Sequence, residues 1–188
     1  MIGAFLVLDN ININIKRFSG TSAGSQVNYI MINKHLIQEG VAWCISVAKT
    51  LEKYPLLRPK KMWLWFKDIS KRCPIPEKEK LNCSLTHFNK GLNIFKFDNL
   101  QINEYYSKKD VGEILLATAA IPWLFYDGLF YKYRNMNVID GGLSDNLQIF
   151  KDNKRPQLVG IWHNKYFPES LQKIDQFGVF VPTDYMIK

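Results

Sequence analysis

The sequence has few of the residues and patterns that mark several common protein classes. Its 188 residues include 3 cysteines, and Cys44, Cys73 and Cys83 form no C-x-x-C pair. An odd number of cysteines completes no disulfide framework, so we expect a reducing, cytoplasmic setting. No basic and apolar leader opens the chain, and the longest nearly uncharged stretch, residues 114–126, is too short to cross a bilayer. We therefore expect a soluble protein without a signal peptide, at most peripheral to a membrane.

Arginine is also scarce, which bears on the net charge of +8. The 25 basic residues comprise 20 lysines and 5 arginines, and they are spread along the chain. Arginine supplies the bidentate donors that recognise phosphates and base edges, so its scarcity argues against specific nucleic-acid binding. The histidines and cysteines show no metal-ligand spacing. We expect no metal and no cofactor.

What is present is an alternation of strand-like and helix-like segments, without an internal repeat or a linker. Strands are expected at 11–15, 81–88, 92–97, 128–133, 137–139 and 157–162, and helices at 2–10, 26–35, 41–54 and 109–119. Residues 55–80 contain four prolines and are expected to connect elements, with one short element at 62–69. The strands at 81–88 and 92–97 should form a hairpin. This order predicts one α/β domain over residues 1–188 with a mainly parallel sheet.

The most informative stretch is Gly20-Thr21-Ser22-Ala23-Gly24, which fits the pattern G-x-S-x-G. It follows a strand-like run and precedes a helix-like one, which is the context of a nucleophile turn. Glycines on either side remove Cβ atoms that would clash in so sharp a turn, and the helix N-terminus would stabilise an oxyanion. Ser22 is therefore a candidate nucleophile, although the same residues suit a tight turn in which Ser22 only caps a helix.

Two further segments complete a family pattern. Asp140-Gly141-Gly142 is by itself an ordinary turn signal, with Asn146 four residues after Gly142. Between the two motifs lies the segment 117–125, with the sequence A-T-A-A-I-P-W-L-F. These three segments, in this order, resemble the patatin-like phospholipase family over about residues 3–165.

The resemblance implies a three-layer α/β/α fold and a Ser-Asp dyad that cleaves fatty acyl esters of lipids or phospholipids. Ser22 would attack the ester carbonyl and form an acyl-enzyme, and Asp140 would accept the proton and later activate water. An aspartate is a weak base at its usual pKa, so it would need burial or a hydrogen bond to Ser22. The residues that would support the motifs and the oxyanion are Gly3, Gly20, Ala23, Gly24, Gly141 and Gly142.

The resemblance also implies a departure at the start of the chain. Family members begin with a strand and a G-G-G-x-R/K-G loop whose N–H groups stabilise the oxyanion, and only Gly3 would match the end of that loop. The expectation is an N-terminally truncated domain. Loss of an oxyanion donor typically slows turnover by about 100 to 1000 fold. An alternative is therefore a catalytically impaired scaffold or interaction protein.

Two other interpretations stay open. The order Ser22, Asp140, His163 is also that of an α/β-hydrolase triad, with His163 following the expected strand at 157–162. The aromatic and basic run 60–67 and the apolar run 123–130 could contact a lipid surface, with the second lining an acyl-chain pocket, or could pack in the core.

Overall fold

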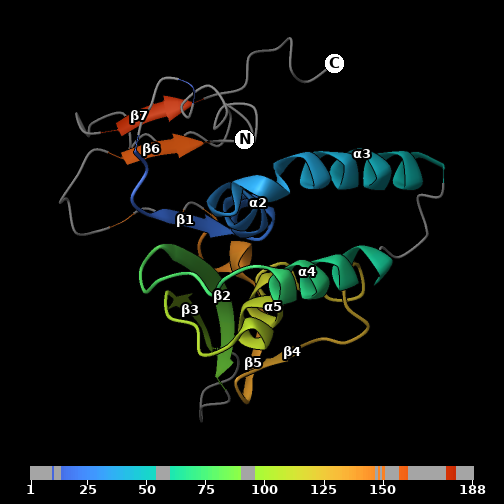
Figure 1. The fold of residues 1–188 in the computed structure, drawn as a ribbon. Helices are drawn as coiled ribbons and strands as arrows, with labels where there is room; N and C mark the ends of the chain where they lie inside the picture. Colours follow the sequence, from blue (N-terminus) through green and yellow to red (C-terminus); the bar gives the residue numbers. More distant parts are fainter. Residues whose placement is uncertain are drawn as a thin grey trace. The chain divides into compact units, whose positions relative to one another are not determined.

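The computed structural model describes residue 10, residues 14–53, 60–89 and 96–146, residues 148 and 150, and residues 157–160 and 177–180 (Figure 1). Two compact units divide the chain: residues 14–148 form one, and residues 1–13 with 149–188 form the other. The expected single domain stays a prediction. Gly3, His163 and residues 2–9 of the helix expected at 2–10 lie outside the described residues.

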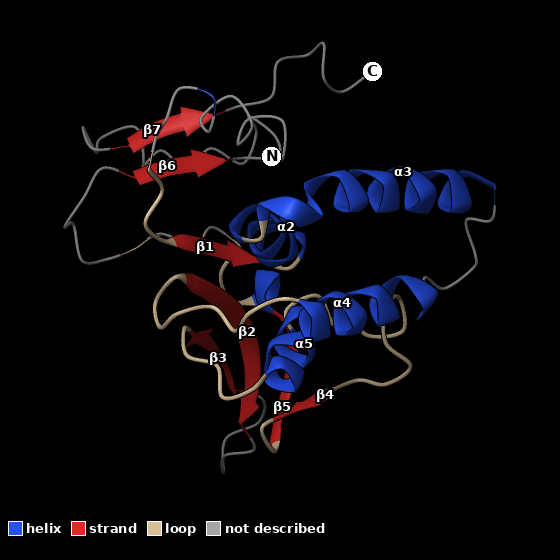
Figure 2. Cartoon of the chain, viewed as in Figure 1, coloured by secondary structure: helices blue, strands red, loops and turns tan. Residues whose placement is uncertain are grey.

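The larger unit is built on a five-stranded mixed sheet (Figure 2). Its strands are β1 (Phe18–Thr21), β2 (Leu81–Asn89), β3 (Lys96–Ile102), β4 (Tyr131–Tyr133) and β5 (Met136–Asp140). β1 pairs with β2 in parallel, whereas β2 with β3, β2 with β5 and β4 with β5 are antiparallel. The α/β class is confirmed, but this sheet is mixed and not mainly parallel. The reason is that β2–β3 and β4–β5 follow one another across short connections, which join antiparallel strands.

The register on β2 places the ends of two strands side by side. β1 pairs with the first half of β2, ending with Thr21 opposite Ser84. β5 pairs with the second half, ending with Asp140 opposite Leu85. β3 occupies the other edge of β2 along both halves. β1 and β5 therefore end at adjacent positions on the same edge of the central strand.

Helices cover this sheet. They are α2 (Ala23–Ile32), the 3-10 turn η1 (Lys34–Leu36), α3 (Ile37–Lys53), α4 (Lys60–Arg72) and α5 (Lys108–Ala117). α2 contacts β1 and β2, and α5 lies against α4 and also contacts β2, β4 and β5. Fully buried side chains from these elements form the core; they include Tyr29, Ile30, Phe66, Ile69, Leu81, Leu85, Ile114 and Leu115.

The helix predictions differ in accuracy. Ser107 caps α5 by accepting the Asp110 N–H at 3.1 Å, and the helix predicted at 109–119 is confirmed within two residues. The short element expected at 62–69 is instead the longer helix α4, which packs against α5 and contacts α3 through Trp65. Trp65 stacks on Trp43 of α3 with ring centroids 4.8 Å apart, and its Nε1 donates to Glu39 at 2.8 Å.

The strand predictions also need one correction. The strand before the Ser22 turn is β1 at Phe18–Thr21. Of the strand expected at 11–15, residues 14–15 form no regular structure, and residues 11–13 lie outside the described residues. The hairpin of β2 and β3 is confirmed, although β3 begins at Lys96. In the smaller unit, β6 (Gln157–Gly160) and β7 (Phe177–Phe180) pair in parallel.

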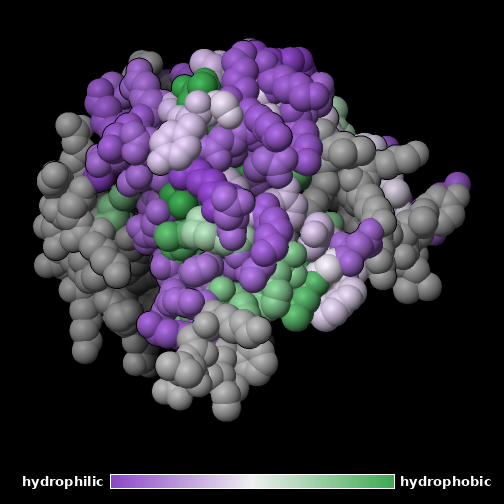
Figure 3. Space-filling view, turned by 90° about the horizontal axis from the view of Figure 1, so that it is seen from below, coloured by the Kyte–Doolittle hydropathy of each residue, from purple (hydrophilic) through white to green (hydrophobic). Residues whose placement is uncertain are grey.

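The face shown in Figure 3 is largely hydrophilic, with hydrophobic residues in several places and a larger group of them in its lower middle. Large apolar side chains that are exposed include Ile45, Phe97, Tyr106, Trp123, Leu124, Leu129 and Leu143. Within the described part of the chain, no helix combines the length and apolar character needed to cross a membrane.

Candidate active site

Ser22 occupies a strained turn between β1 and α2. Its backbone has φ 52° and ψ −126°, in a region that non-glycine residues rarely adopt. Gly20 makes this turn possible, because a Cβ there would lie 2.7 Å from the Gly24 carbonyl carbon and the Ser25 nitrogen. The sharp strand-to-helix turn expected from the sequence is present, and Ser22 stays partly accessible to solvent.

The start of α2 offers hydrogen-bond donors beside Ser22. The first N–H groups of a helix have no acceptor within the helix, and the Ser22 side chain makes no capping hydrogen bond. Ala23, the first residue of α2, is exposed. Its N–H and the helix dipole would favour an anion at this position. The expectation that Ser22 only caps the helix is therefore not met.

Asp140 ends β5 and begins the 3-10 turn η2 (Gly141–Leu143). One carboxyl oxygen, Oδ1, accepts the Gly142 N–H at 2.7 Å. The other, Oδ2, is buried and has no hydrogen-bond partner among the described residues. Asp140 therefore holds its carboxyl group at a set orientation with one oxygen free to accept a proton.

Burial raises the pKa of Asp140 above its usual value, and the nearby Ser22 hydroxyl and the Gly142 N–H lower it in part. Ser22 is thus close enough to lower the pKa of the carboxyl group, while Oδ2 makes no hydrogen bond to a described residue. Catalytic hydrogen bonds are often long before substrate binds. The two residues singled out by the sequence motifs are brought together by the fold.

Their proximity follows from the pairing of β1 and β5 with the same strand. Thr21, the last residue of β1, donates its hydroxyl to the Asp145 carbonyl oxygen at 2.9 Å, across the gap between the two turns. Thr86 of β2 donates its hydroxyl to the Asp140 carbonyl oxygen at 2.8 Å. The nucleophile turn and the Asp140 turn are therefore joined to each other and to the sheet.

Three residues with defined roles in the nucleophile turn escaped the sequence reasoning. Ser25 donates its hydroxyl to the Gly20 carbonyl oxygen at 2.6 Å, and Asn28 donates its amide to the Ser19 carbonyl oxygen at 2.9 Å. Thr118 accepts the Ser22 N–H on Oγ1 at 3.0 Å. All three are buried polar side chains. The only signal for Thr118 in the sequence was its place in the segment 117–125.

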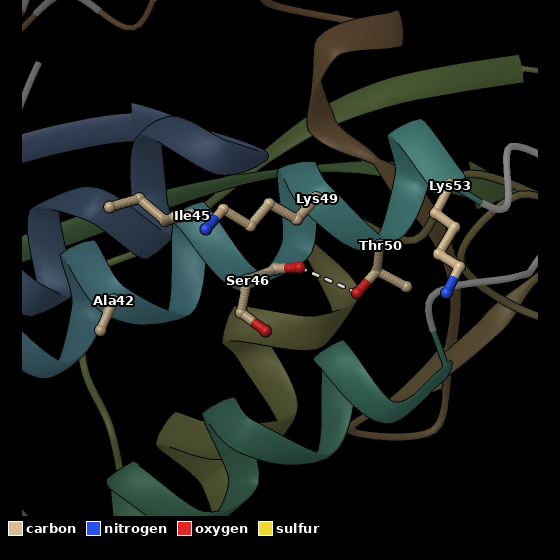
Figure 4. Close-up of a pocket in the computed structure, with 6 residues that line it drawn as sticks. All are labelled: Ala42, Ile45, Ser46, Lys49, Thr50 and Lys53. Atoms are coloured by element: carbon tan, nitrogen blue, oxygen red, sulfur yellow. Dashed lines mark hydrogen bonds between the residues drawn. The ribbon is translucent and has the colours of Figure 1, made fainter.

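A hollow of about 570 Å³ lies elsewhere in the same unit, along one face of α3 (Figure 4). Its lining side chains follow one another along the helix; they are Ala42, Ile45, Ser46, Lys49, Thr50 and Lys53. Neither Ser22 nor Asp140 takes part. The chemistry of the candidate site is thus set by the two turns, and not by this hollow.

The remaining expectations concern metals and lipid contact. Within the described ranges, no three or more His, Cys, Asp or Glu side chains are grouped to hold a metal ion. In the run 60–67, Trp65 packs between α3 and α4. In the run 123–130, Trp123 is 59% exposed and adopts φ 58°. Trp123 is therefore exposed to solvent, in the same segment, 117–125, as Thr118, which contacts Ser22.

Comparison with protein families agrees with these motifs. A sequence profile of the family described as patatin-like phospholipase matches residues 1–150. This range includes both turns and Thr118. No curated protein sequence matches the chain.

Proposed function

Because the chain belongs to the patatin-like phospholipase family, a family of lipid hydrolases, we propose that it cleaves fatty acyl esters with Ser22 and Asp140. One observation carries this proposal above the others. The buried Oδ2 of Asp140 has no hydrogen-bond partner among the residues that the structure describes, and the hydroxyl of Ser22, in its strained turn, is near enough to lower the pKa of that carboxyl group. A nucleophile beside an unengaged base is the arrangement that activates serine.

In the first step, Ser22 Oγ attacks the ester carbonyl carbon while Asp140 Oδ2 takes the hydroxyl proton. The raised pKa of Asp140 supports this role, because a carboxylate with a higher pKa is a stronger base. The Gly142 N–H holds Oδ1, which leaves Oδ2 directed to the proton transfer. The product of this step is a tetrahedral intermediate with a negatively charged oxygen.

The oxyanion needs donors that are in place before the reaction begins. The Ala23 N–H follows the nucleophile at the start of α2, where such a donor is found in nucleophile turns. The second donor expected near Gly3 stays a prediction. Collapse of the intermediate breaks the bond to the leaving alcohol, which takes the proton from Asp140, and leaves an acyl-enzyme on Ser22.

Water then completes the cycle. Asp140 takes a proton from water as its oxygen attacks the acyl carbon, and the bond to Ser22 Oγ breaks. Ser22 recovers its proton from Asp140, and a fatty acid leaves. The substrate class is a lipid ester, and phospholipids are included in it.

A fluorophosphonate probe, which reacts with activated serines, tests the proposal directly. We expect labelling of the full chain that is lost in Ser22→Ala and strongly slowed in Asp140→Asn. The matched control is Ser46→Ala, which removes an exposed serine on α3 and should label as the unchanged protein does. Absence of labelling in folded protein would defeat the proposed hydrolysis and favour the scaffold alternative.

The variant His163→Ala distinguishes the Ser22 and Asp140 dyad from the triad alternative. If Asp140 is the base, this variant should retain labelling and hydrolysis of a short-chain p-nitrophenyl ester. Loss of both in a folded variant would replace the dyad by a Ser22, Asp140 and His163 triad.

A further inference from the structure

We infer that Thr118 is the positioning residue that holds Ser22 and Asp140 in register. The inference rests on the proposed function, since it assigns the residue that aligns its two reacting groups. Thr118 directly follows α5 and is completely buried. Its side chain contacts one turn of the site, and its backbone contacts the other.

The hydrogen bonds of the Thr118 hydroxyl have fixed directions. Its single proton goes to the Ser84 carbonyl oxygen at 2.7 Å, since a carbonyl can only accept. Oγ1 is then an acceptor for the Ser22 N–H at 3.0 Å. Ser25 Oγ lies 3.3 Å from Oγ1, but its own proton is used on the Gly20 carbonyl oxygen. The Thr118 oxygen is therefore oriented toward the backbone of Ser22.

The backbone around Thr118 positions the second turn. The Thr118 carbonyl oxygen accepts the Gly141 N–H at 3.2 Å, and the Ala120 carbonyl oxygen accepts the Asp140 N–H at 3.2 Å. The backbone carbonyl groups of Thr118 and Ala120 thus hold the base and the residue after it. One residue joins the nucleophile turn to the base turn by direct hydrogen bonds.

Ser84 of the central strand anchors this arrangement. Its carbonyl oxygen accepts the Thr118 hydroxyl, and Gly141 lies so close to the same oxygen that a Cβ would approach to 2.3 Å. Thr21 pairs opposite Ser84 in the sheet. Thr118 and Gly141 therefore both contact the Ser84 carbonyl group, and Ser22 is linked to it through Thr118.

Loss of the hydroxyl should affect reactivity more than substrate binding. Strained backbone conformations persist only where surrounding contacts hold them. Without the Thr118 hydroxyl, the N–H of the strained residue Ser22 would lose its acceptor. A misplacement of about 1 Å in a reacting group can cost about 100 fold in rate. We expect Thr118→Val, which keeps the branched shape, to lower kcat by up to about 100 fold with little change in KM.

The test compares fluorophosphonate labelling rates, kcat and KM of the unchanged protein, Thr118→Val and Thr118→Ser. Serine retains the oxygen that accepts the Ser22 N–H, so Thr118→Ser should restore kcat close to that of the unchanged protein. Ser70→Ala is the control for losing a buried hydroxyl, because Ser70 donates to the Lys67 carbonyl oxygen within α4. It should lose stability without a fall in kcat.

The outcomes separate the two proposals. If the unchanged protein is not labelled, the proposed function fails. If it is labelled and Thr118→Val reacts at the same rate, or if Thr118→Ser is as slow as Thr118→Val, the inference on Thr118 is overturned alone. Should circular dichroism show that Thr118→Val is unfolded, Thr118→Ala takes its place with the same expected results.

Discussion

Gly141 lies so close to Ser84 that a Cβ atom added to it would stand 2.3 Å from the Ser84 carbonyl oxygen. Real side chains do not approach backbone oxygen so closely, so the turn after Asp140 rests on the central strand only because residue 141 is glycine. None of the described glycines has a positive φ, so here close packing, and not backbone freedom, requires the residue. This contact brings the turn after Asp140 close against β2.

We expect Gly141→Ala to destabilise the fold by about 1–3 kcal/mol, the usual cost of overpacking. The added methyl group must displace either the turn or β2, because the atom it meets is backbone. The free energy of unfolding in urea measures the loss. A variant as stable as the unchanged protein would contradict the close contact with Ser84.

Gly142→Ala should behave differently, because its methyl group would meet a side chain. The nearest atom is Asp140 Oδ1 at 2.9 Å, the oxygen that accepts the Gly142 N–H. The carboxyl group can rotate away, so we expect a smaller loss of stability than in Gly141→Ala. Fluorophosphonate labelling should nevertheless fall, because the orientation of the base changes. Full labelling at an unchanged rate would argue against Asp140 as the base.

Asp140→Asn should raise stability at neutral pH by about 0.5–2 kcal/mol. The pKa of Asp140 is raised above 3.8 in the folded protein, mainly by burial. The folded state then holds a proton that the unfolded chain has released, so stability falls as pH rises between the two pKa values. Asparagine does not ionise, so the stability of the variant does not fall as pH rises through this window. Thermal unfolding at a series of pH values should show the gain above this window and none below it.

Asp110→Asn provides a matched comparison with the opposite sign. Burial raises the pKa of Asp110, but hydrogen bonds from Arg134 and the Tyr106 N–H outweigh it and leave the pKa lowered. Arg134 Nε donates to Oδ1 at 3.1 Å. Asp110 therefore stabilises the fold above pH 3.8, and this contribution is lost as pH falls through the lowered pKa.

We expect Asp110→Asn to cost about 1–3 kcal/mol at neutral pH, because the charged partner Arg134 is left only partly satisfied. Arg134 keeps its stacking over the Tyr106 ring, 4.2 Å from the ring centroid. The same series of thermal unfolding measurements decides the point. If Asp110→Asn and Asp140→Asn shift stability in the same direction at pH 7, the assigned environments of the two carboxyl groups are wrong.

Local sequence signals predicted the elements whose stability depends on neighbouring residues. The helix-like run at 109–119 marks α5, and Gly20 with Gly24 marks the turn at Ser22. The errors occur where distant packing decides. In the alternating run 11–15, the described residues 14–15 form no strand, and the strand that pairs with β2 is 18–21. The prolines of 55–80 suggested a connection, yet residues 60–72 form the helix α4, which packs against α5 and contacts α3 through Trp65.

Sequence alone was sufficient to nominate Ser22 and Asp140, because the glycines that each turn requires are adjacent to it in the chain. It was not sufficient to place them together, since that depends on β1 and β5 ending at Ser84 and Leu85 of the same strand. Nor could it assign Thr118 its hydrogen bond to Ser22, 96 residues away. A hydrogen bond between distant residues has no periodic or local signature, so only the folded arrangement of β2, α5 and the two turns determines it.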